Sequence, residues 1–234
     1  MSIPLIPIFD GDSVAYASSG PVKEDEPISF ALQNCKRSIE AIVDKFDRGL
    51  EIQLYLTGSG NFREQVATIQ PYKGNRTQPK PPYLPDVRQY MVEIWRATVV
   101  DGKEADDQVA IEYLKDPANR CIVSIDKDLD QIPGNHYNYR KDLFYEVSEA
   151  EAAYNFWVQV LTGDRVDNIR GIPGIGPKKA EKLLQQCAHS EYHMYEIAKR
   201  EYALAYPDNP NALQEHCDLL YIWRKENDKW APPT

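Results

Sequence analysis

The chain has 234 residues, of which 42% are hydrophobic and 27% charged, enough to build one sizeable α/β domain with a small appendage. No apolar run approaches the roughly 20 residues of a membrane span, and the N-terminal segment lacks the basic region and cleavage site of a signal peptide. The four cysteines show no paired spacing, which suits a reducing compartment. We therefore expect a cytoplasmic protein without a membrane segment.

The net charge of −9 argues at first against a nucleic-acid partner, but phosphate binding depends on local charge. The acidic residues concentrate in short motifs. The basic residues form two separate stretches, one with Lys73, Arg76, Lys80 and Arg88, the other with Lys178, Lys179 and Lys182. Net charge therefore excludes no function here.

In chain order, apolar runs and helical periodicity alternate over the first 150 residues. Strands are predicted at Ile3–Phe9, Glu51–Leu56 and Cys121–Ile125, and helices at 28–48, Val87–Arg96 and Ala105–Leu114. Between them, Pro71–Pro85 holds five prolines and predicts an irregular, mobile segment. From about residue 150 the pattern is helical only. This order predicts an α/β fold with a central, mostly parallel sheet flanked by helices, followed by a C-terminal helical region.

Carboxylates recur where predicted strands end or predicted helices begin. They are Asp10, then Glu104, Asp106 and Asp107, then Asp126 and Asp128, and finally Asp164 and Asp167. Mg²⁺ prefers oxygen ligands, and two such ions about 4 Å apart can clamp an in-line phosphoryl displacement. Carboxylates from several strand ends and loops are needed to surround two ions, and this pattern supplies them.

Simpler interpretations of the same residues exist. Any one aspartate is more often a turn residue or a helix cap than a metal ligand. Asp10-Gly-Asp12 also resembles the Asp-x-Asp of haloacid-dehalogenase phosphatases, although the threonine that normally follows is missing. Cys187, His189, His193, His216 and Cys217 suggest zinc, but their spacings match no standard ligand pattern.

The segment GIPGIGPKKAEKLL has the pattern of a helix–hairpin–helix, with Gly171, Gly174 and Gly176 before an amphipathic helix that carries Lys178 and Lys179. Glycines let backbone N–H groups approach a phosphate, and the helix N-terminus adds its positive dipole. Lysines at this place bind a phosphate backbone without reading bases. The simpler interpretation is a turn between two helices with a solvated lysine face.

Four segments together, NFREQVATIQPYKGNR, EADD, SIDKDLDQ and GDRVDNIRGIPGIGPKKAEKLL, resemble the 5′-nuclease (flap endonuclease) superfamily, including the 5′-nuclease domain of bacterial DNA polymerase I and stand-alone bacteriophage 5′–3′ exonucleases. The resemblance extends from about Ile3 to Leu184. It implies a nuclease core at 1–150 with an arch or gateway segment at about 71–101. It further implies a helical DNA-binding region at 151–234, with the hairpin at about 164–185.

The resemblance also implies roles for single residues. Asp10, Glu104 and Asp106 match the carboxylates around a first Mg²⁺, and Asp106, Asp126, Asp128 and Asp164 match those around a second. Asp107 and Asp167 match further acidic positions that act through water. Lys73 and Arg76 match basic gateway residues at the scissile phosphate, and Arg63 and Tyr72 match residues that place the substrate. Mn²⁺ is expected to substitute for Mg²⁺, and K⁺ to bind the hairpin carbonyls.

The implied activity is a 5′→3′ exonuclease with flap-endonuclease activity on DNA or RNA/DNA duplexes, acting as a monomer alongside replication proteins. The chain departs from the family pattern at the end of the second strand, where Leu56 and Thr57 replace an aspartate. Its segment from Arg76 to Asp101 is also short for an arch. Two other functions stay open: a PIN-like ribonuclease, which lacks the glycine hairpin, and a non-catalytic binder of DNA structures.

Overall fold

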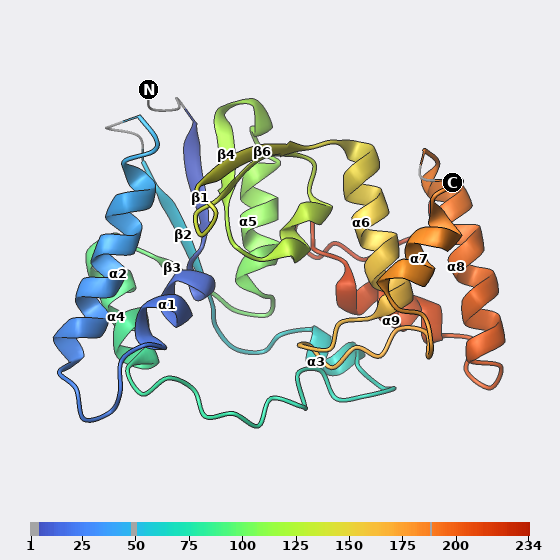
Figure 1. Cartoon of the computed structure of the whole chain (residues 1–234), viewed down its shortest axis with the longest axis horizontal. Helices are drawn as coiled ribbons and strands as arrows, with labels where there is room; N and C mark the ends of the chain where they lie inside the picture. The colour runs from blue at the N-terminus through green and yellow to red at the C-terminus, as the bar shows by residue number, and fades with distance from the viewer. Residues whose placement is uncertain (1–4, 48–50, 188) are drawn as a thin grey trace. The chain divides into compact units, whose positions relative to one another are not determined.

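The computed structural model describes residues 5–47, 51–187 and 189–234, and these fall into two compact units. Unit 1 comprises residues 1–60, 78–129 and 134–146, and unit 2 comprises residues 61–77, 130–133 and 147–234. Figure 1 labels most of the helices and strands of both. Each unit has a hydrophobic core of its own.

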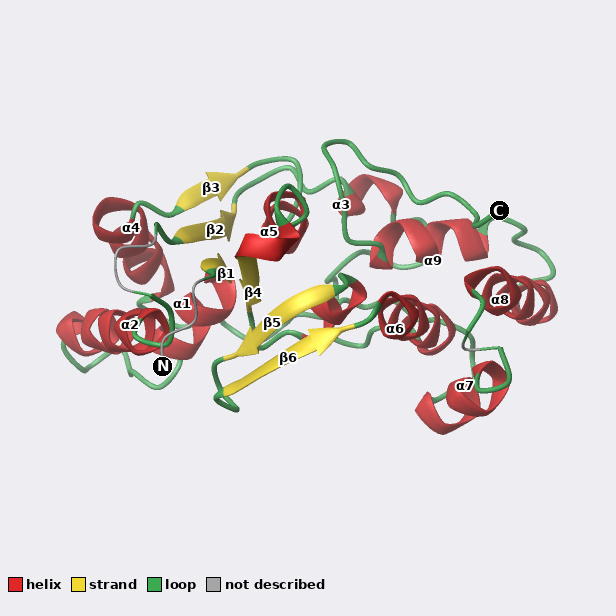
Figure 2. Cartoon of the chain, turned by 90° about the horizontal axis from the view of Figure 1, so that it is seen from above, coloured by secondary structure: helices red, strands yellow, loops and turns green. Residues whose placement is uncertain are grey.

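Unit 1 is an α/β unit built on one six-stranded sheet with the order β3-β2-β1-β4-β5-β6 (Figure 2). Its strands are β1 (Ile6–Asp10), β2 (Gln53–Thr57), β3 (Thr98–Val100), β4 (Arg120–Val123), β5 (Gly134–Asn138) and β6 (Leu143–Val147). Its helical segments are α1 (Gly11–Ser19), α2 (Ile28–Val43), α4 (Leu84–Trp95), α5 (Ala105–Tyr113), η1 (Pro117–Asn119) and the first three residues of η2 (Lys127–Gln131).

Strand β1 lies at the centre of the sheet and is parallel to both neighbours. Phe9 pairs with Leu54 of β2 and with Val123 of β4. The pairs β2–β3 and β4–β5 are parallel too. Only four residues join β5 to β6, and so short a link permits only an antiparallel pair. The predicted central, mostly parallel sheet is confirmed, and the carboxyl ends of β1, β2 and β4 share one edge.

Helices cover both faces of this sheet. Helices α1, α2 and α4 lie on one face and α5 on the other (Figure 2). Burial of Phe9, Ile39, Leu56 and Met91, each with no exposed surface, joins the first three helices to the strands. Apolar side chains at helical spacing on α2 supply much of this core, because they face the sheet while the charged residues between them face solvent.

Unit 2 is helical. Its elements are α3 (Arg63–Val66), α6 (Glu149–Thr162), α7 (Pro177–Leu184), α8 (Glu191–Ala205) and α9 (Ala212–Leu220). Its core is centred on Trp157 and Leu161 of α6, which have no exposed surface. Helix α6 begins with a capping box: the Ser148 hydroxyl accepts from the N–H of Glu151, whose carboxylate accepts from the N–H of Ser148.

Several elements differ from the predicted ones. Helix α1 and strands β3, β5 and β6 were not predicted, and β4 ends two residues earlier than expected. Residues 61–77, predicted to belong to the first domain, group with the C-terminal helices because their backbone bonds to them: Thr68 and Ile69 N–H donate to Glu215 at 2.8 and 2.7 Å. Residues 3, 4 and 48 of the predicted elements lie outside the described part. The proline-rich segment is irregular as predicted up to Tyr83, and its last two residues begin α4.

Within the described residues, no helix combines the length and the apolar character that crossing a bilayer requires. All four cysteines are free and buried. Burial raises the pKa of the Cys35 thiol to about 11 and that of Cys121 to about 12.

Candidate metal centre and nucleic-acid interface

Asp10 ends the central strand of unit 1 and caps helix α1. Its Oδ1 accepts from the N–H groups of Asp12 at 3.1 Å and Ser13 at 3.3 Å, so one carboxylate oxygen satisfies backbone donors that the first turn leaves open. The side chain is 5% exposed. Burial and the nearby charge of Asp12 raise the pKa of Asp10 to about 6, and Asp126 adds to this shift.

A short chain of hydrogen bonds connects Asp10 to the predicted ligands after β4. Ser124 follows that strand directly and donates its hydroxyl to Oδ2 of Asp10 at 3.2 Å. The same hydroxyl accepts from the N–H of Asp126 at 3.0 Å, and Oδ1 of Asp126 accepts from the N–H of Asp128 at 2.9 Å. Sequence reasoning missed Ser124, because the strand predicted at Cys121–Ile125 included it, whereas β4 ends at Val123.

The third group of carboxylates stands at the beginning of α5. Glu104 is the N-cap in extended conformation, and Oδ2 of Asp107 accepts from its N–H at 3.0 Å. Asp107 has no exposed surface. It therefore acts as the closing residue of a capping box, the simpler interpretation of this aspartate, while its predicted action on the metal through water stays a prediction. Asp106 lies in the first helical turn between them.

The charges of these groups act on one another. The pKa of Asp106 is raised well above its ordinary value, first by burial and then by the charges of Asp10, Asp126, Glu104 and Asp107. In unit 1, five of the six predicted ligands therefore lie near enough for their charges to repel one another. The sixth, Asp128, lies two residues after Asp126. As the side chains are placed, no three acidic, histidine or cysteine residues of the described ranges form a set ready to hold an ion.

The donor set fits a hard divalent cation. It consists of carboxylate oxygens from two strand ends and one helix start, with no sulfur or imidazole among the predicted ligands. Asp10 and Asp107 are buried, and buried like charges are costly unless a cation offsets them. Mutual repulsion is therefore the property that identifies this cluster as a candidate metal centre.

The position that lacks the family aspartate is engaged in another way. Thr57 ends β2, and its hydroxyl accepts from the N–H of Ala105, the first residue of α5, at 2.9 Å. Its own N–H donates to Oδ2 of Asp12 at 3.0 Å. The guanidinium of Arg88 donates to Oδ1 of Asp12 and to the Thr57 carbonyl. Arg88, considered at first as part of a basic stretch, is thus tied to an acidic partner.

In unit 2 the YKGNR segment is organised around Asp167. Its carboxylate accepts from the Tyr72 hydroxyl at 2.7 Å and from Nη2 of Arg76 at 2.7 Å, and Nζ of Lys73 lies 3.6 Å away. The Lys73 N–H donates to the Asp167 carbonyl at 2.9 Å, with Lys73 in the left-handed region at φ 54°. Asp167 therefore holds three predicted site residues in one group. Its predicted contact with metal through water stays a prediction.

Asp164 shapes the loop that carries Asp167. Its Oδ1 accepts from the N–H groups of Val166 at 2.7 Å and Asp167 at 3.2 Å, and its backbone exchanges two hydrogen bonds with Ile169. The side chain is 7% exposed. These bonds account for the turn itself, and the predicted part of Asp164 in the second metal site stays a prediction.

The predicted glycines differ in what they do. Gly171 has φ 61°, and a Cβ there would lie 2.2 Å from the nitrogen of Gly163, so the two backbone runs meet directly. Gly174 has φ 79° in open space, and Gly176 caps α7 with open space around it. Gly171 is therefore a packing residue, whereas Gly174 and Gly176 leave an unobstructed approach to the start of α7.

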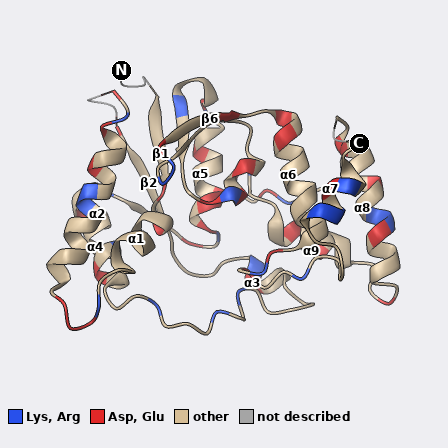
Figure 3. Ribbon diagram, in the orientation of Figure 1, with Lys and Arg blue, Asp and Glu red and all other residues tan. Residues whose placement is uncertain are grey.

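Helix α7 buries Ala180 and Leu184 and exposes Lys178 and Lys179, as the amphipathic pattern predicted. Figure 3 shows positive charge gathered on this helix. Arg63, in contrast, is 3% exposed, and its guanidinium donates to the carbonyls of Leu219 at 2.8 Å and Tyr221 at 2.9 Å. Its predicted substrate contact would require this packing to open, and it stays a prediction.

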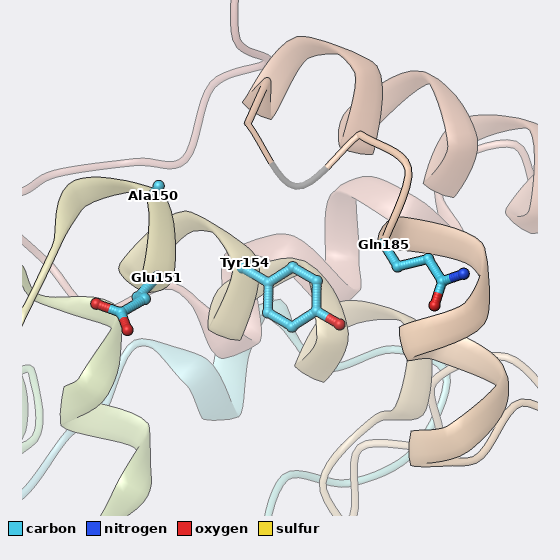
Figure 4. Close-up of a pocket in the computed structure, with 4 residues that line it drawn as sticks. All are labelled: Ala150, Glu151, Tyr154 and Gln185. Carbon is cyan, nitrogen blue, oxygen red and sulfur yellow. The ribbon is translucent and has the colours of Figure 1, made fainter.

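A hollow of about 350 Å³ beside α6 holds none of the predicted site residues (Figure 4). Tyr154 of α6 and Gln185 at the end of α7 line it, together with Ala150 and Glu151. The Glu151 carboxylate already accepts from the Ser148 N–H and hydroxyl at 2.9 and 2.7 Å. The hollow therefore offers a phenol and an amide, and we assign it no chemistry.

No protein-family model matches the chain. Curated relatives do: it is 36% identical over 133 residues to DNA polymerase I of Rhizobium leguminosarum, covering 49% of this chain and 13% of that protein. It is 28% identical over 148 residues to a 5′-3′ exonuclease of Bacillus subtilis, covering 55% and 49%.

Solved structures share the fold. The bacteriophage T5 D15 protein, co-crystallised with metal ions, superposes with a TM-score of 0.68 at 17% identity, covering 92% of this chain and 88% of that one. Flap endonuclease-1 from Methanococcus jannaschii gives 0.54 at 12% identity, covering 94% and 92%. By sequence and by fold the chain is thus similar to proteins named 5′-3′ exonuclease and flap endonuclease. It spans about half of the Bacillus exonuclease and about an eighth of the Rhizobium polymerase, so its likeness to them does not by itself fix its activity.

Proposed function

We propose that the chain is a divalent-metal-dependent 5′→3′ exonuclease with structure-specific flap-endonuclease activity. It would hydrolyse phosphodiester bonds near the 5′ ends of DNA or RNA/DNA duplexes by a two-metal mechanism. The observation that carries the proposal is the group of mutually repelling carboxylates at the carboxyl edge of the unit 1 sheet. The relatives named 5′-3′ exonuclease and the metal-bound and DNA-bound relatives of the same fold support it.

On this proposal Asp10, Glu104, Asp106, Asp126 and Asp128 hold Mg²⁺, with Mn²⁺ as a substitute, and Asp164 contributes to the second ion. When bound, the metals supply an activated water and offset charge on the scissile phosphate. Ser124 orients Asp10, because its hydroxyl donates to one carboxylate oxygen and fixes which oxygen faces the ion.

The cations of unit 2 have a second role. Asp167 fixes the positions of the Lys73 and Arg76 side chains through ion pairs. A preorganised cation near a reacting phosphate stabilises the charge that develops in the transition state. Tyr72 offers a ring on which a base of any identity can stack. Lys178 and Lys179 bind the duplex backbone, with K⁺ as a further ligand of the hairpin.

The test is cleavage of a labelled 5′-flap and of blunt duplex DNA with Mg²⁺, with Mn²⁺ and with excess EDTA. The double substitution Asp126→Asn with Asp128→Asn is expected to abolish cleavage and leave the fold intact. The matched control, Asp25→Asn with Glu40→Gln, removes two exposed carboxylates of unit 1 and should keep full activity.

Each other outcome has a definite meaning. Full activity in EDTA contradicts the metal mechanism. Cleavage of single-stranded RNA in preference to every DNA substrate would support a PIN-like ribonuclease instead. Tight binding of flap DNA without cleavage in either metal would make the chain a non-catalytic binder.

A further inference from the structure

Asp12 lies two residues after Asp10 but outside the predicted ligand set. Its carboxylate is fully engaged: Oδ2 accepts from the Thr57 N–H at 3.0 Å and Oδ1 from the guanidinium of Arg88. The same guanidinium donates to the Thr57 carbonyl. Both charged side chains are about a quarter exposed, 25% for Asp12 and 26% for Arg88, so water screens the pair only in part.

This pair touches the candidate metal centre from two sides. The Asp12 N–H donates to Oδ1 of Asp10 at 3.1 Å, within one turn of α1. Thr57, bonded to both members of the pair, accepts through its hydroxyl from Ala105, the residue after Glu104. Arg88 itself comes from α4. A charge on either residue is therefore placed beside the end of β1 and the start of α5, from which four predicted ligands come.

We propose that Arg88 and Asp12 form a charge-tuning pair that sets the affinity of the divalent-metal site. Arg88 keeps a permanent positive charge and offsets part of the charge of Asp12, so the centre has one additional carboxylate whose effect on the metal is only partly expressed. The inference rests on the proposed function, because it presupposes that the centre binds a divalent cation. It makes Asp12 and Arg88 positioning and tuning residues and leaves the chemistry to the ligands.

The competing interpretation is a structural clamp that joins α4, α1 and the end of β2. The two make opposite predictions for one substitution. Removing a clamp loosens the site and weakens metal binding. Removing the positive charge of a tuning pair leaves the charge of Asp12 free to attract the metal and strengthens metal binding. One unit charge several ångströms from a divalent ion changes the binding of that ion several-fold even in a partly aqueous setting.

The experiment is a double-substitution cycle with Mn²⁺ as the probe, using the full chain without DNA. Affinity is measured by calorimetry and by the loss of the free Mn²⁺ signal in electron paramagnetic resonance. Arg88→Met should bind Mn²⁺ about threefold or more tightly than the parent, and Asp12→Asn about threefold or more weakly. The double variant restores neutrality and should return to near the parent affinity. The differences in Mn²⁺ affinity among the variants should shrink as the salt concentration rises from about 20 to about 500 mM, because the Debye length then falls from about 20 to about 4 Å.

Controls keep the result interpretable. Arg37→Met makes the same change on an exposed residue of α2 in the same unit and should leave the affinity unchanged. Arg88→Gln retains hydrogen-bond donors without charge and should also tighten binding, which covers the case in which Arg88→Met fails to fold. Circular dichroism confirms folding throughout.

The outcomes separate the two proposals. If the parent binds Mn²⁺ and cleaves DNA, but both single variants and the double variant bind more weakly, the pair is a clamp and the tuning inference is wrong. If the parent does not bind Mn²⁺ at millimolar concentration, the metal centre itself is wrong and the tuning falls with it. Tighter binding by Arg88→Met, reversed by adding Asp12→Asn, supports both.

Discussion

The surroundings of Asp10 disfavour its ionised form as long as no cation is bound. Its side chain is buried, Asp12 and Asp126 repel it, and its pKa rises from 3.8 to about 6. Between these two pH values the unfolded chain ionises at this residue while the folded chain does not. Stability from this group is thus fully present below about pH 4 and is lost as the pH rises through 6.

A substitution at Asp10 should therefore stabilise the metal-free protein. Asp10→Asn removes the charge and keeps a side chain of the same shape. At pH 7.5 in EDTA we expect this substitution to raise the free energy of unfolding by up to about 3 kcal/mol, the equivalent of the pKa shift. At pH 3.5 we expect the free energy of unfolding to be unchanged. Urea unfolding at the two pH values measures the difference.

At pH 7.5, Mg²⁺ should make the parent more stable than Asp10→Asn, because it binds and stabilises the parent and not the variant. The exposed Asp25→Asn serves as the control and should change neither value. A variant that is less stable than the parent in EDTA at pH 7.5 would show that the Asp10 charge is already compensated in the metal-free protein.

Asp167 offers a second residue-scale test, since two roles are open to it. Asp167→Ala removes the acceptor shared by Tyr72, Arg76 and Lys73. If it acts through these side chains, cleavage should slow by about tenfold or more while Mn²⁺ affinity stays at the parent value, because misplaced groups cost rate rather than metal binding. Single-turnover kinetics and calorimetry check the two halves. A matching fall in Mn²⁺ affinity would instead support its predicted place near the metal.

Single residues also show where sequence reasoning stopped. The acidic motifs of unit 1 could be found because each follows a strand or opens a helix, and the charges of five of these residues act on one another in the structure, while their role as metal ligands stays a prediction. The residues that hold these carboxylates in place could not be found from the sequence. They are Ser124, Thr57 and Arg88, which act through hydrogen bonds between segments that lie 31 to 114 positions apart in the chain. A lone serine or arginine carries no spacing pattern that predicts such a bond.

At the scale of elements, apolar periodicity predicted most of what has a buried face. Strand β1 and helices α2, α4 and α5 were found this way. Strand β3 has three residues, two of them exposed, and β5 has the sequence GNHYN, so neither shows the apolar run or alternation that marks a strand. These strands form because a neighbour in the sheet offers them hydrogen bonds. Local preferences along the sequence do not reveal that neighbour.

The loop between α6 and α7 closes on two glycines, and this makes a sharp prediction. Gly171→Ala would place a methyl group against the Gly163 and Thr162 backbone in a left-handed conformation. We expect a loss of about 3 kcal/mol or more in the free energy of unfolding, the size typical of a backbone clash in a packed site. Gly176→Ala, at a position with open space, should cost about 1 kcal/mol or less.

Thermal and urea unfolding measure both variants, and the comparison is internal because the same methyl group is added at two nearby positions of one loop. Equal losses at the two positions would mean that the close approach of the two backbone runs is absent in solution. Retained stability with weaker duplex binding in Gly176→Ala would fit its predicted place beside a phosphate.

For the whole molecule, a net charge of −9 coexists with exposed lysines on α7. Lys178→Ala with Lys179→Ala should weaken duplex binding and flatten the slope of log affinity against log salt by about 0.9 for each phosphate that the protein no longer neutralises. Turnover at saturating DNA should stay near the parent value, because the carboxylates and Lys73 are unchanged. Fluorescence anisotropy across a salt series measures the slope.

The charge-matched control is Lys199→Ala with Arg200→Ala, two exposed residues of α8 that already pair with Glu196 and Glu201. It alters the net charge equally and should leave the slope nearly unchanged. If both double variants flatten the slope alike, the duplex senses overall charge and α7 is no special anchor.

The four buried cysteines have a practical consequence for observing this protein at work. Their thiols are shielded, and burial raises the pKa of Cys35, Cys121, Cys187 and Cys217, so at neutral pH the native chain presents little thiolate to an alkylating dye. A cysteine introduced at exposed Lys182 should therefore take up a maleimide fluorophore selectively, with no need to remove the natural ones. A single-site reporter on α7 is thus available in an otherwise unaltered chain.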